Sequence, residues 1–156
     1  MHIQVLNTAG DVIEMSGMPN IIHDVLMVED DESHAFIIRH CLEKRLDIKL
    51  HHAIDGEEAL NYFPKDPAEK NEVLPKLVLL DLRMPKMDGL EVLAYIRNIS
   101  AYDNVPIIIM TSSDAPSDKA KAVELRANGY VTKSFDFNEF KTELKNICNQ
   151  WLKKMN

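Results

Sequence analysis

The sequence predicts a single α/β domain in which helices cover both faces of a parallel β-sheet. Its length of 156 residues favours one domain. Short apolar runs with strand character alternate five times with segments of helical periodicity, which is the pattern of a parallel sheet with crossover helices. The runs at 76–80 and 105–111 are apolar almost throughout, as is typical of strands that are buried on both faces.

Each expected element can be placed by its apolar spacing and its end signals. Strands are expected at 24–28, 48–54, 76–80, 105–111 and 130–133. Helices are expected at 32–45, 55–63, 88–98, 117–128 and 136–154. Asp55 and Glu58 have the spacing of a capping box at the start of the second helix. Gly129 fits the C-terminal cap of the fourth helix.

Residues 1–22 are expected to form an N-terminal extension ahead of a domain at 23–156. Two alternating stretches, "HIQVL" and "DVIEM", flank a segment that could turn, so a β-hairpin is one interpretation. A loose tail is the other, because an isolated hairpin is only marginally stable in water. The segment "SGMPN" at 16–20 has the composition of a linker.

Composition and charge narrow the classes of function. The net charge is −7, which argues against a general nucleic-acid binder and against docking on an anionic membrane. No apolar stretch approaches the roughly 18 residues of a membrane span, and no signal peptide is recognisable, so a cytoplasmic location is expected. Cys41 and Cys148 lie far apart without a CxxC pattern and are interpreted as small core residues on helices.

Polar side chains follow the predicted strands at the points where these strands end. The first strand is followed by three acids at 29–31, the third by Asp81, the fourth ends on Thr111, and the fifth ends on Lys133. Functional sites gather at the carboxyl ends of parallel strands, so these groups are expected to share one pocket. Crowded carboxylates favour a bound cation, and oxygen ligands suit Mg²⁺. A carboxylate can accept a phosphoryl group, whose oxygens a hydroxyl and an ammonium can bind.

Four motifs, in order, give the sequence a resemblance to a known family. They are "VLMVEDD", "LVLLDLRMPKMDGLEVL", "VPIIIMTSS" and "GYVTKSF". Together they resemble the response-regulator receiver domain, the CheY-like family of two-component signalling, over about residues 23–154. The resemblance implies a flavodoxin-like, doubly wound sheet of five parallel strands in the order 2-1-3-4-5.

The resemblance also implies a Mg²⁺ site. Asp30 and Asp81 match direct ligands of the metal, Glu29 matches an acid that acts through water, and the main-chain carbonyl of Arg83 matches the remaining protein ligand. Without the resemblance, the sequence also allows Asp30 and Asp31 as the pair of acids that follows the first strand. We prefer Glu29 and Asp30, because they follow the strand directly and leave Asp31 at the helix start, where a carboxylate suits the helix dipole.

The resemblance also implies a phosphoacceptor and the residues of a conformational switch. Asp81 matches the phosphoacceptor, Thr111 the switch hydroxyl, Lys133 the lysine of the pocket, and Tyr130 the aromatic residue that turns inward on activation. One departure is that Lys133 precedes Ser134 instead of the family's usual proline. A cis bond before a non-proline residue costs about 2.5–4 kcal/mol, so the choice between a cis and a trans bond stays open.

The expected function is that of a stand-alone two-component response regulator. A sensor histidine kinase would be the phosphoryl donor, and a downstream protein would receive the signal by contact. The chain would catalyse only its own phosphorylation and dephosphorylation, and the segment 117–154 is a candidate homodimer surface. Within the family, "TKS", the loop at 64–75 and Trp151 resemble the small regulators that are paired with bacterial phytochromes.

Other functions remain alternatives. The protein could be a phosphorelay intermediate that passes its phosphoryl group to a histidine phosphotransfer protein, or a degenerate receiver that binds partners without phosphorylation. A dehalogenase-type phosphatase also uses an aspartyl phosphate, but it has a second acid two residues after the nucleophile, where this chain has Arg83. His51 and His52 are interpreted as surface residues on opposite faces of a strand rather than as a metal site.

Overall fold

The main body of the computed structural model is a five-stranded parallel sheet. The structure describes residues 2–6, 8–16, 21–69, 73–133 and 136–153. The strands of this sheet are β3 (His23–Val28), β4 (Ile48–Ala53), β5 (Leu77–Leu80), β6 (Ile107–Thr111) and β7 (Gly129–Thr132). They pair in the order β4-β3-β5-β6-β7. Numbered within the sheet, this order is 2-1-3-4-5, so the predicted topology is confirmed.

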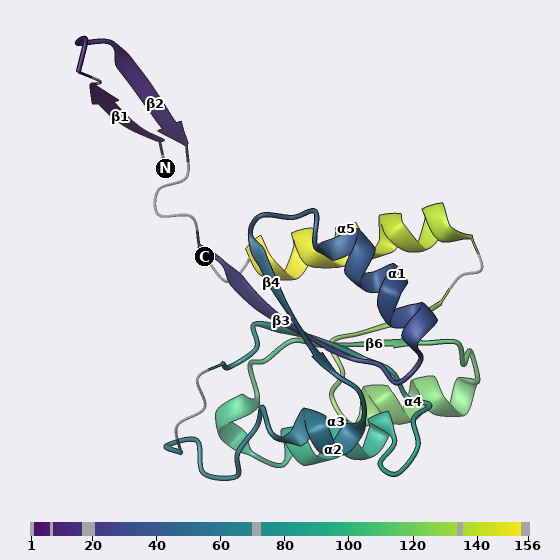
Figure 1. Ribbon diagram of the computed structural model, residues 1–156. Coiled ribbons are helices and arrows are strands. Elements are labelled where there is room, and N and C mark those ends of the chain that lie inside the picture. Colours follow the sequence, from purple (N-terminus) through teal and green to yellow (C-terminus); the bar gives the residue numbers. More distant parts are fainter. Residues whose placement is uncertain (1, 7, 17–20, 70–72, 134–135, 154–156) are drawn as a thin grey trace.

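Helices cover both faces of the sheet, which confirms the doubly wound arrangement (Figure 1). They are α1 (Glu32–Leu42), α2 (Gly56–Leu60), α3 (Gly89–Arg97), α4 (Pro116–Glu124) and α5 (Phe137–Lys153), with a short 3-10 helix, η1, at Ser100–Tyr102. Figure 1 shows α1 and α5 on one face and α2, α3 and α4 on the other. Each face has its own apolar core, and both cores share the buried strands of the sheet.

Parallel pairing brings the carboxyl ends of the strands to the same edge of the sheet. Val28 at the end of β3 lies opposite Leu80 at the end of β5, and Thr111 at the end of β6 lies opposite Thr132 on β7. Both β5 and β6 are buried along their whole length. The polar residues that follow these strands therefore start from a rigid, fully packed frame.

The N-terminal segment contains an antiparallel hairpin of β1 (His2–Leu6) and β2 (Val12–Ser16). Gly10 has a φ of 86° in the connection, a conformation that glycine adopts without strain. In Figure 1 the hairpin stands apart from the five-stranded sheet. Most of the expected linker lies outside the described residues, as do residues 70–72 of the loop 64–75 and Ser134.

The end of the fourth helix differs from the prediction. Helix α4 ends at Glu124, and the chain then turns through Arg126, whose φ is 66°. Gly129 is the first residue of β7 and does not cap the helix. The helix is closed by main-chain hydrogen bonds that the N–H groups of Arg126 and Ala127 donate to the carbonyls of Val123 and Ala122. Beyond this turn, Oδ1 of Asn128 accepts hydrogen bonds from the main-chain N–H of Ile107 and from the guanidinium of Arg97. These bonds fix the start of β7 against β6 and α3.

Candidate phosphoacceptor site

Three carboxylates form a cluster at the carboxyl edge of the sheet. Glu29 and Asp30 follow β3, and Asp81 follows β5; one carboxylate oxygen from each lies within 4.8 Å of those of the others. Glu29 is 1% exposed and Asp81 is 6% exposed, whereas Asp30 is open to solvent. Glu29 Oε2 is buried and has no hydrogen-bond partner among the described residues. The cluster therefore contains buried negative charge and an unused oxygen lone pair.

The pKa values of the two buried acids, Glu29 and Asp81, are shifted in opposite directions. Burial, together with a hydrogen bond to Asp81, raises the pKa of Glu29 to about 8, against the opposing effect of Lys133. Burial also raises the pKa of Asp81, but the contact with Glu29, the Lys133 ammonium and the N–H of Arg83 outweigh it, so this pKa lies below its usual value. Without a further cation, the pair therefore favours a state in which Glu29 holds a proton and Asp81 is ionised.

Lys133 brings a positive charge into the cluster from the end of β7. Its ammonium donates to Glu29 Oε1 and lies 3.4 Å from Asp81 Oδ2. The Nδ1 atom of His34, on α1, lies 2.9 Å from the same ammonium and 3.2 Å from Glu29 Oε1. Only 8% of the Lys133 side chain is exposed. The ammonium is therefore held between two carboxylates and an imidazole at the floor of the pocket.

The neighbouring strands β6 and β7 contribute a hydroxyl group and an aromatic ring near the acidic cluster. Thr111 is fully buried at the end of β6, and its hydroxyl contributes to lowering the pKa of Asp81. The N–H of Ser113 lies 3.3 Å from Thr111 Oγ1, and the Tyr130 hydroxyl donates to the carbonyl of Ser113 at 2.7 Å. The half-buried Tyr130 ring is thus connected to Thr111 through the segment that follows β6.

The loop after Asp81 is shaped by close main-chain packing. A Cβ atom on Gly89 would lie 2.1 Å from the carbonyl oxygen of Asp81, so this position has no room for a side chain. Asp88 caps α3 by accepting from the N–H of Glu91, which ends the loop. The N–H of Arg83 lies 3.3 Å from Asp81 Oδ1. The Asp-Gly pair of the sequence motif therefore places the loop against the acid that it follows.

The structure separates the roles of the three consecutive acids. Asp31 is the N-cap of α1, where its Oδ1 accepts from the N–H groups of Ser33 at 2.9 Å and His34 at 3.1 Å. Glu29 and Asp30 face Asp81 in the cluster. This arrangement matches the preferred pairing of Glu29 with Asp30.

Two histidines of β4 have partners that the sequence did not indicate. His52 Nε2 lies 2.7 Å from the carbonyl oxygen of Glu29, and its Nδ1 lies 3.2 Å from an Arg39 nitrogen. His51 lies on the other face and contacts Asp24 at 2.8 Å. The expectation of opposite faces is confirmed, but both rings are half-buried rather than fully on the surface. The contact of His52 with the carbonyl supports the main chain where the acidic cluster begins.

The site residue that sequence reasoning missed is His34. It lies on the solvent-facing side of α1 by sequence pattern, and nothing local distinguishes it from other polar helix residues. Its partner Lys133 is 99 positions away along the chain. The only available signal was the general expectation that the first turn of this helix lies near the strand ends.

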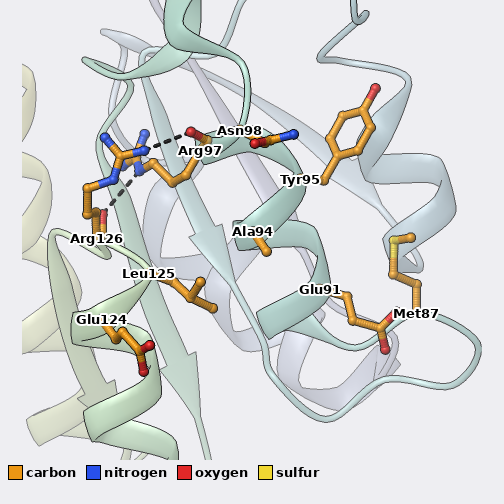
Figure 2. A pocket seen from close by; sticks show the side chains of 9 residues that line it. All are labelled: Met87, Glu91, Ala94, Tyr95, Arg97, Asn98, Glu124, Leu125 and Arg126. Carbon is orange, nitrogen blue, oxygen red and sulfur yellow. Dashed lines mark hydrogen bonds between the residues drawn. The ribbon is translucent and has the colours of Figure 1, made fainter.

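Away from the acidic cluster, a pocket of about 660 Å³ lies between α3 and the end of α4 (Figure 2). Its lining includes Arg97 and Arg126, each of which donates to the main-chain carbonyl of the other. The buried Arg97 guanidinium also donates to the carbonyls of Tyr102 and Val105. This network holds α3 to the segment before β7, and none of the residues that line this pocket belongs to the acidic cluster.

Two further expectations can be compared with the described residues. Cys41 and Cys148 are both free thiols on α1 and α5, and burial raises the pKa of Cys148 to about 11, which keeps it protonated. Among the helices that the structure describes, none combines the length and the apolar character needed to cross a membrane.

Comparison with known proteins identifies relatives along most of the chain. The family model described as "Response regulator receiver domain" matches residues 25–145. The probable methanogenesis regulatory protein FilR2 of Methanothrix harundinacea is 35% identical over 146 residues, which are 92% of this chain and 90% of the relative. The response regulator Rcp1 of a Synechocystis strain is 31% identical over 139 residues, or 88% of this chain and 95% of the relative.

Solved structures show the same architecture. The phosphorylated cyanobacterial phytochrome response regulator RcpA has a TM-score of 0.77 and 30% identity, with 84% of this chain and 94% of that chain covered. The Mn²⁺-bound form of Rcp1 has a TM-score of 0.75 and 30% identity, with coverage of 83% and 94%. The resemblance drawn from the four sequence motifs is therefore confirmed, including its narrower likeness to phytochrome regulators.

Proposed function

Because the chain belongs to the response-regulator receiver domain family and is thus a two-component response regulator, we propose that Asp81 is its phosphoacceptor. The observation that carries this assignment is the position of Asp81: an ionised, nearly buried carboxylate beside two acids and one ammonium. Among these groups, Asp81 alone is in reach of Lys133, the Arg83 N–H and the Thr111 hydroxyl together. These donors can bind the oxygens of a group attached to it.

A divalent cation fits the cluster, and we assign it as Mg²⁺. The donor set consists of carboxylate oxygens, and Glu29 Oε2 is buried without a hydrogen bond among the described residues. Asp30, Asp81 and the main-chain carbonyl of Arg83 would hold the ion directly, and Glu29 would act through water. The ion would supply charge neutralisation at the phosphoryl oxygens. The related regulator Rcp1 has been solved in a Mn²⁺-bound form, which supports the proposal that this chain also binds a divalent ion.

The transfer step uses the residues of the chain as follows. An Asp81 oxygen forms a bond to phosphorus while the P–N bond to a kinase phosphohistidine breaks. The donor ring, which carries a proton on its other nitrogen, leaves with the bonding electron pair as neutral imidazole. Lys133 exchanges its contact with Asp81 for one with a phosphoryl oxygen, because its ammonium already lies on this side of the acid. Water later attacks the same phosphorus and restores the carboxylate, so the chain catalyses only these two steps on itself.

We expect Thr111 to transmit the change at Asp81 to the rest of the domain. An acyl phosphate on Asp81 adds a charge of about −1.5 to −2 if it ionises like other phospho-residues. Its oxygens need hydrogen-bond donors, and in the unphosphorylated pocket these donors contact other groups. Movement of Thr111 toward Asp81 would shift the segment at Ser113, to which the Tyr130 hydroxyl is bonded. The surface that responds is then 117–154, which contains β7, α5 and all of α4 except its first residue. This surface is our candidate for a downstream partner or a homodimer.

The domain bounds, the location and the lack of nucleic-acid binding remain proposals from the sequence. We place the receiver domain at 23–156 and the extension at 1–22, and we propose a cytoplasmic location without binding to nucleic acid, which the net charge of −7 disfavours. Transfer of the phosphoryl group onward to a histidine phosphotransfer protein is compatible with the same site. Partner transfer would be measured by incubating labelled protein with candidate histidine proteins.

Acetyl phosphate with Mg²⁺ tests the acceptor. Intact-mass measurement should show one phosphoryl group on the wild type and none on Asp81→Asn, which keeps the shape of the side chain and removes the nucleophile. Circular dichroism provides the control for folding. Normal labelling of Asp81→Asn, with loss of label on mutation of another acid, would overturn the assignment. Turnover of diverse phosphomonoesters would indicate the phosphatase alternative, and a wild type that takes no label would indicate a degenerate receiver.

A further inference from the structure

The geometry points to His34 as a positioning residue that holds the Lys133 ammonium where a phosphoryl oxygen can reach it, an inference that rests on the proposed role of Asp81. A lysine ammonium has three N–H donors and no acceptor. Three acceptors surround it here: Glu29 Oε1, His34 Nδ1 at 2.9 Å and Asp81 Oδ2 at 3.4 Å. His34 therefore completes the hydrogen bonding of a charged group that is almost fully buried.

The role of His34 as an acceptor follows from its neighbours. A proton on Nδ1 could reach Glu29 Oε1 at 3.2 Å, but it would leave one N–H of the ammonium, 2.9 Å away, without an acceptor. With its lone pair on Nδ1, the ring accepts from Lys133 and carries its own proton on Nε2. Glu29 Oε1, 3.2 Å from Nδ1, accepts from the same ammonium, so the two acceptors lie beside each other as ligands do around a cation.

Lys133 needs such a support because the space beside it is open. Lys133 and His34 both line a cavity of about 380 Å³ that extends along Ile37 and Phe140. A flexible lysine side chain next to a cavity has other positions available to it, and fixing a rotamer-rich side chain costs free energy. His34 lies on α1, which is fixed by the Asp31 cap, so it holds the ammonium from a rigid element.

The contact with His34 is also the one that can survive phosphorylation. A phosphoryl group on Asp81 takes over the N–H that now points to Asp81 Oδ2, the longest of the three contacts. The Glu29 carboxylate is expected to turn toward a metal-bound water. His34 keeps its contact with Lys133 while the contacts with Asp81 and Glu29 change, and it thereby holds the ammonium beside Asp81. Removal of its acceptor atom should weaken binding of a phosphoryl group without removing the acceptor or the acidic cluster.

Two variants of His34 and one control separate this role from simple packing. His34→Asn keeps an acceptor oxygen at nearly the place of Nδ1, whereas His34→Leu keeps a similar volume and removes the acceptor. His40→Leu is the matched control, because His40 lies on the same helix and stacks on Phe36, with ring centroids 6.1 Å apart. Melting temperatures identify any loss of folding that the variants share.

The first readout needs no metal. In NMR spectra selective for lysine ammonium groups, recorded without Mg²⁺ and assigned with Lys133→Arg, the wild type should show a slowly exchanging Lys133 signal. This signal should persist in His34→Asn and His40→Leu and disappear in His34→Leu. A signal that persists in His34→Leu, or that is also lost in the control, would overturn the inference whatever the outcome at Asp81.

The second readout is the affinity for beryllofluoride, a mimic of the phosphoryl group, at saturating Mg²⁺. His34→Leu should bind about fivefold more weakly than the wild type, as expected for the loss of one net hydrogen bond. His34→Asn should restore most of the affinity. If His34→Leu binds within twofold of the wild type, or more tightly, while its Asp81 is still labelled by acetyl phosphate, the inference is wrong and the proposed function stands. If the wild type takes no label at Asp81, the proposed function itself fails.

Discussion

The neighbouring acids Asp30 and Asp31 allow a sharp test of the metal site. The structure places Asp30 in the cluster with Glu29 and Asp81, and uses Asp31 to cap α1. Replacing each by alanine removes the same charge one residue apart. We expect Asp30→Ala to abolish stabilisation by Mg²⁺, and Asp31→Ala to lower the stability of the fold while leaving the response to Mg²⁺ unchanged.

The expected sizes follow from binding linkage and from helix capping. An ion that binds only the folded state at one hundred times its dissociation constant adds about 2.7 kcal/mol. For a domain of this length, about 2–4 °C in melting temperature corresponds to 1 kcal/mol, so Mg²⁺ should raise the melting temperature of the wild type by about 5–11 °C. Loss of the Asp31 cap should lower the melting temperature by about 2–4 °C, with and without Mg²⁺. Without Mg²⁺, Asp30→Ala should melt at or above the wild type, because like charge in the cluster is reduced.

Differential scanning calorimetry across a Mg²⁺ titration measures both effects in one experiment, and Na⁺ at matched ionic strength controls for general screening. Asp30→Ala should give a flat titration, and Asp31→Ala a titration parallel to that of the wild type. If Asp31→Ala gives the flat curve, the acidic pair is Asp30 with Asp31 and the alternative register holds. If the wild type does not respond at millimolar Mg²⁺, the cluster is not a competent metal site.

Three further predictions concern the switch, the acid pair and the buried arginine. Thr111→Ala should still accept phosphate at Asp81 but show little change around Tyr130 and in 117–154; backbone NMR shifts with and without beryllofluoride measure this, and shifts as large as those of the wild type would exclude Thr111 as the link. In Mg²⁺-free buffer, the free energy of unfolding should fall as pH rises from 4.5 toward 8, because a folded-state pKa of about 8 favours protonated Glu29 and this contribution is lost as the proton leaves. Urea unfolding across pH should show a flatter dependence for Glu29→Gln, and equal slopes would contradict the assignment. Arg97→Lys should cost about 2–4 kcal/mol in urea unfolding, since several buried carbonyls lose their donor; the exposed Arg126→Lys should cost under about 1 kcal/mol, and equal effects would mean that burial of Arg97 is unimportant.

The sheet and the polar strand ends could be predicted because they depend on local pattern. A buried parallel strand is marked by consecutive apolar residues, as in β5 and β6, and the first polar residue after it marks the sheet edge. Asp81 and Thr111 are found in this way. Alternation with helices then makes the strands parallel, which brings their carboxyl ends together. The prediction therefore needed no side-chain contact to locate the pocket.

What could not be predicted depends on contacts without a sequence period. Asn128 holds the start of β7 by bonding to Ile107 and Arg97, which are 21 and 31 positions away. Gly129 then takes the first position of β7, although its local surroundings match a helix cap. His34 likewise acts across 99 positions. Each of these side chains has a partner that only the packing of helices on the sheet determines, and local propensity carries no information about it.

The net charge of the acidic cluster relates the fold to the proposed phosphoryl transfer. Glu29, Asp30 and Asp81 carry three negative charges when ionised, and Lys133 returns one, so the pocket holds a net charge of −2. A divalent cation neutralises this charge and removes the reason for Glu29 to keep its proton. The phosphoryl group then adds a charge of about −1.5 to −2. The groups that can bind its oxygens are those that can exchange their present hydrogen-bond partners. Lys133 can turn from Asp81, and Thr111 can move on its own strand end. We therefore propose that the response lies in the segment after β6 and in β7, where the Tyr130 hydroxyl donates to the carbonyl of Ser113.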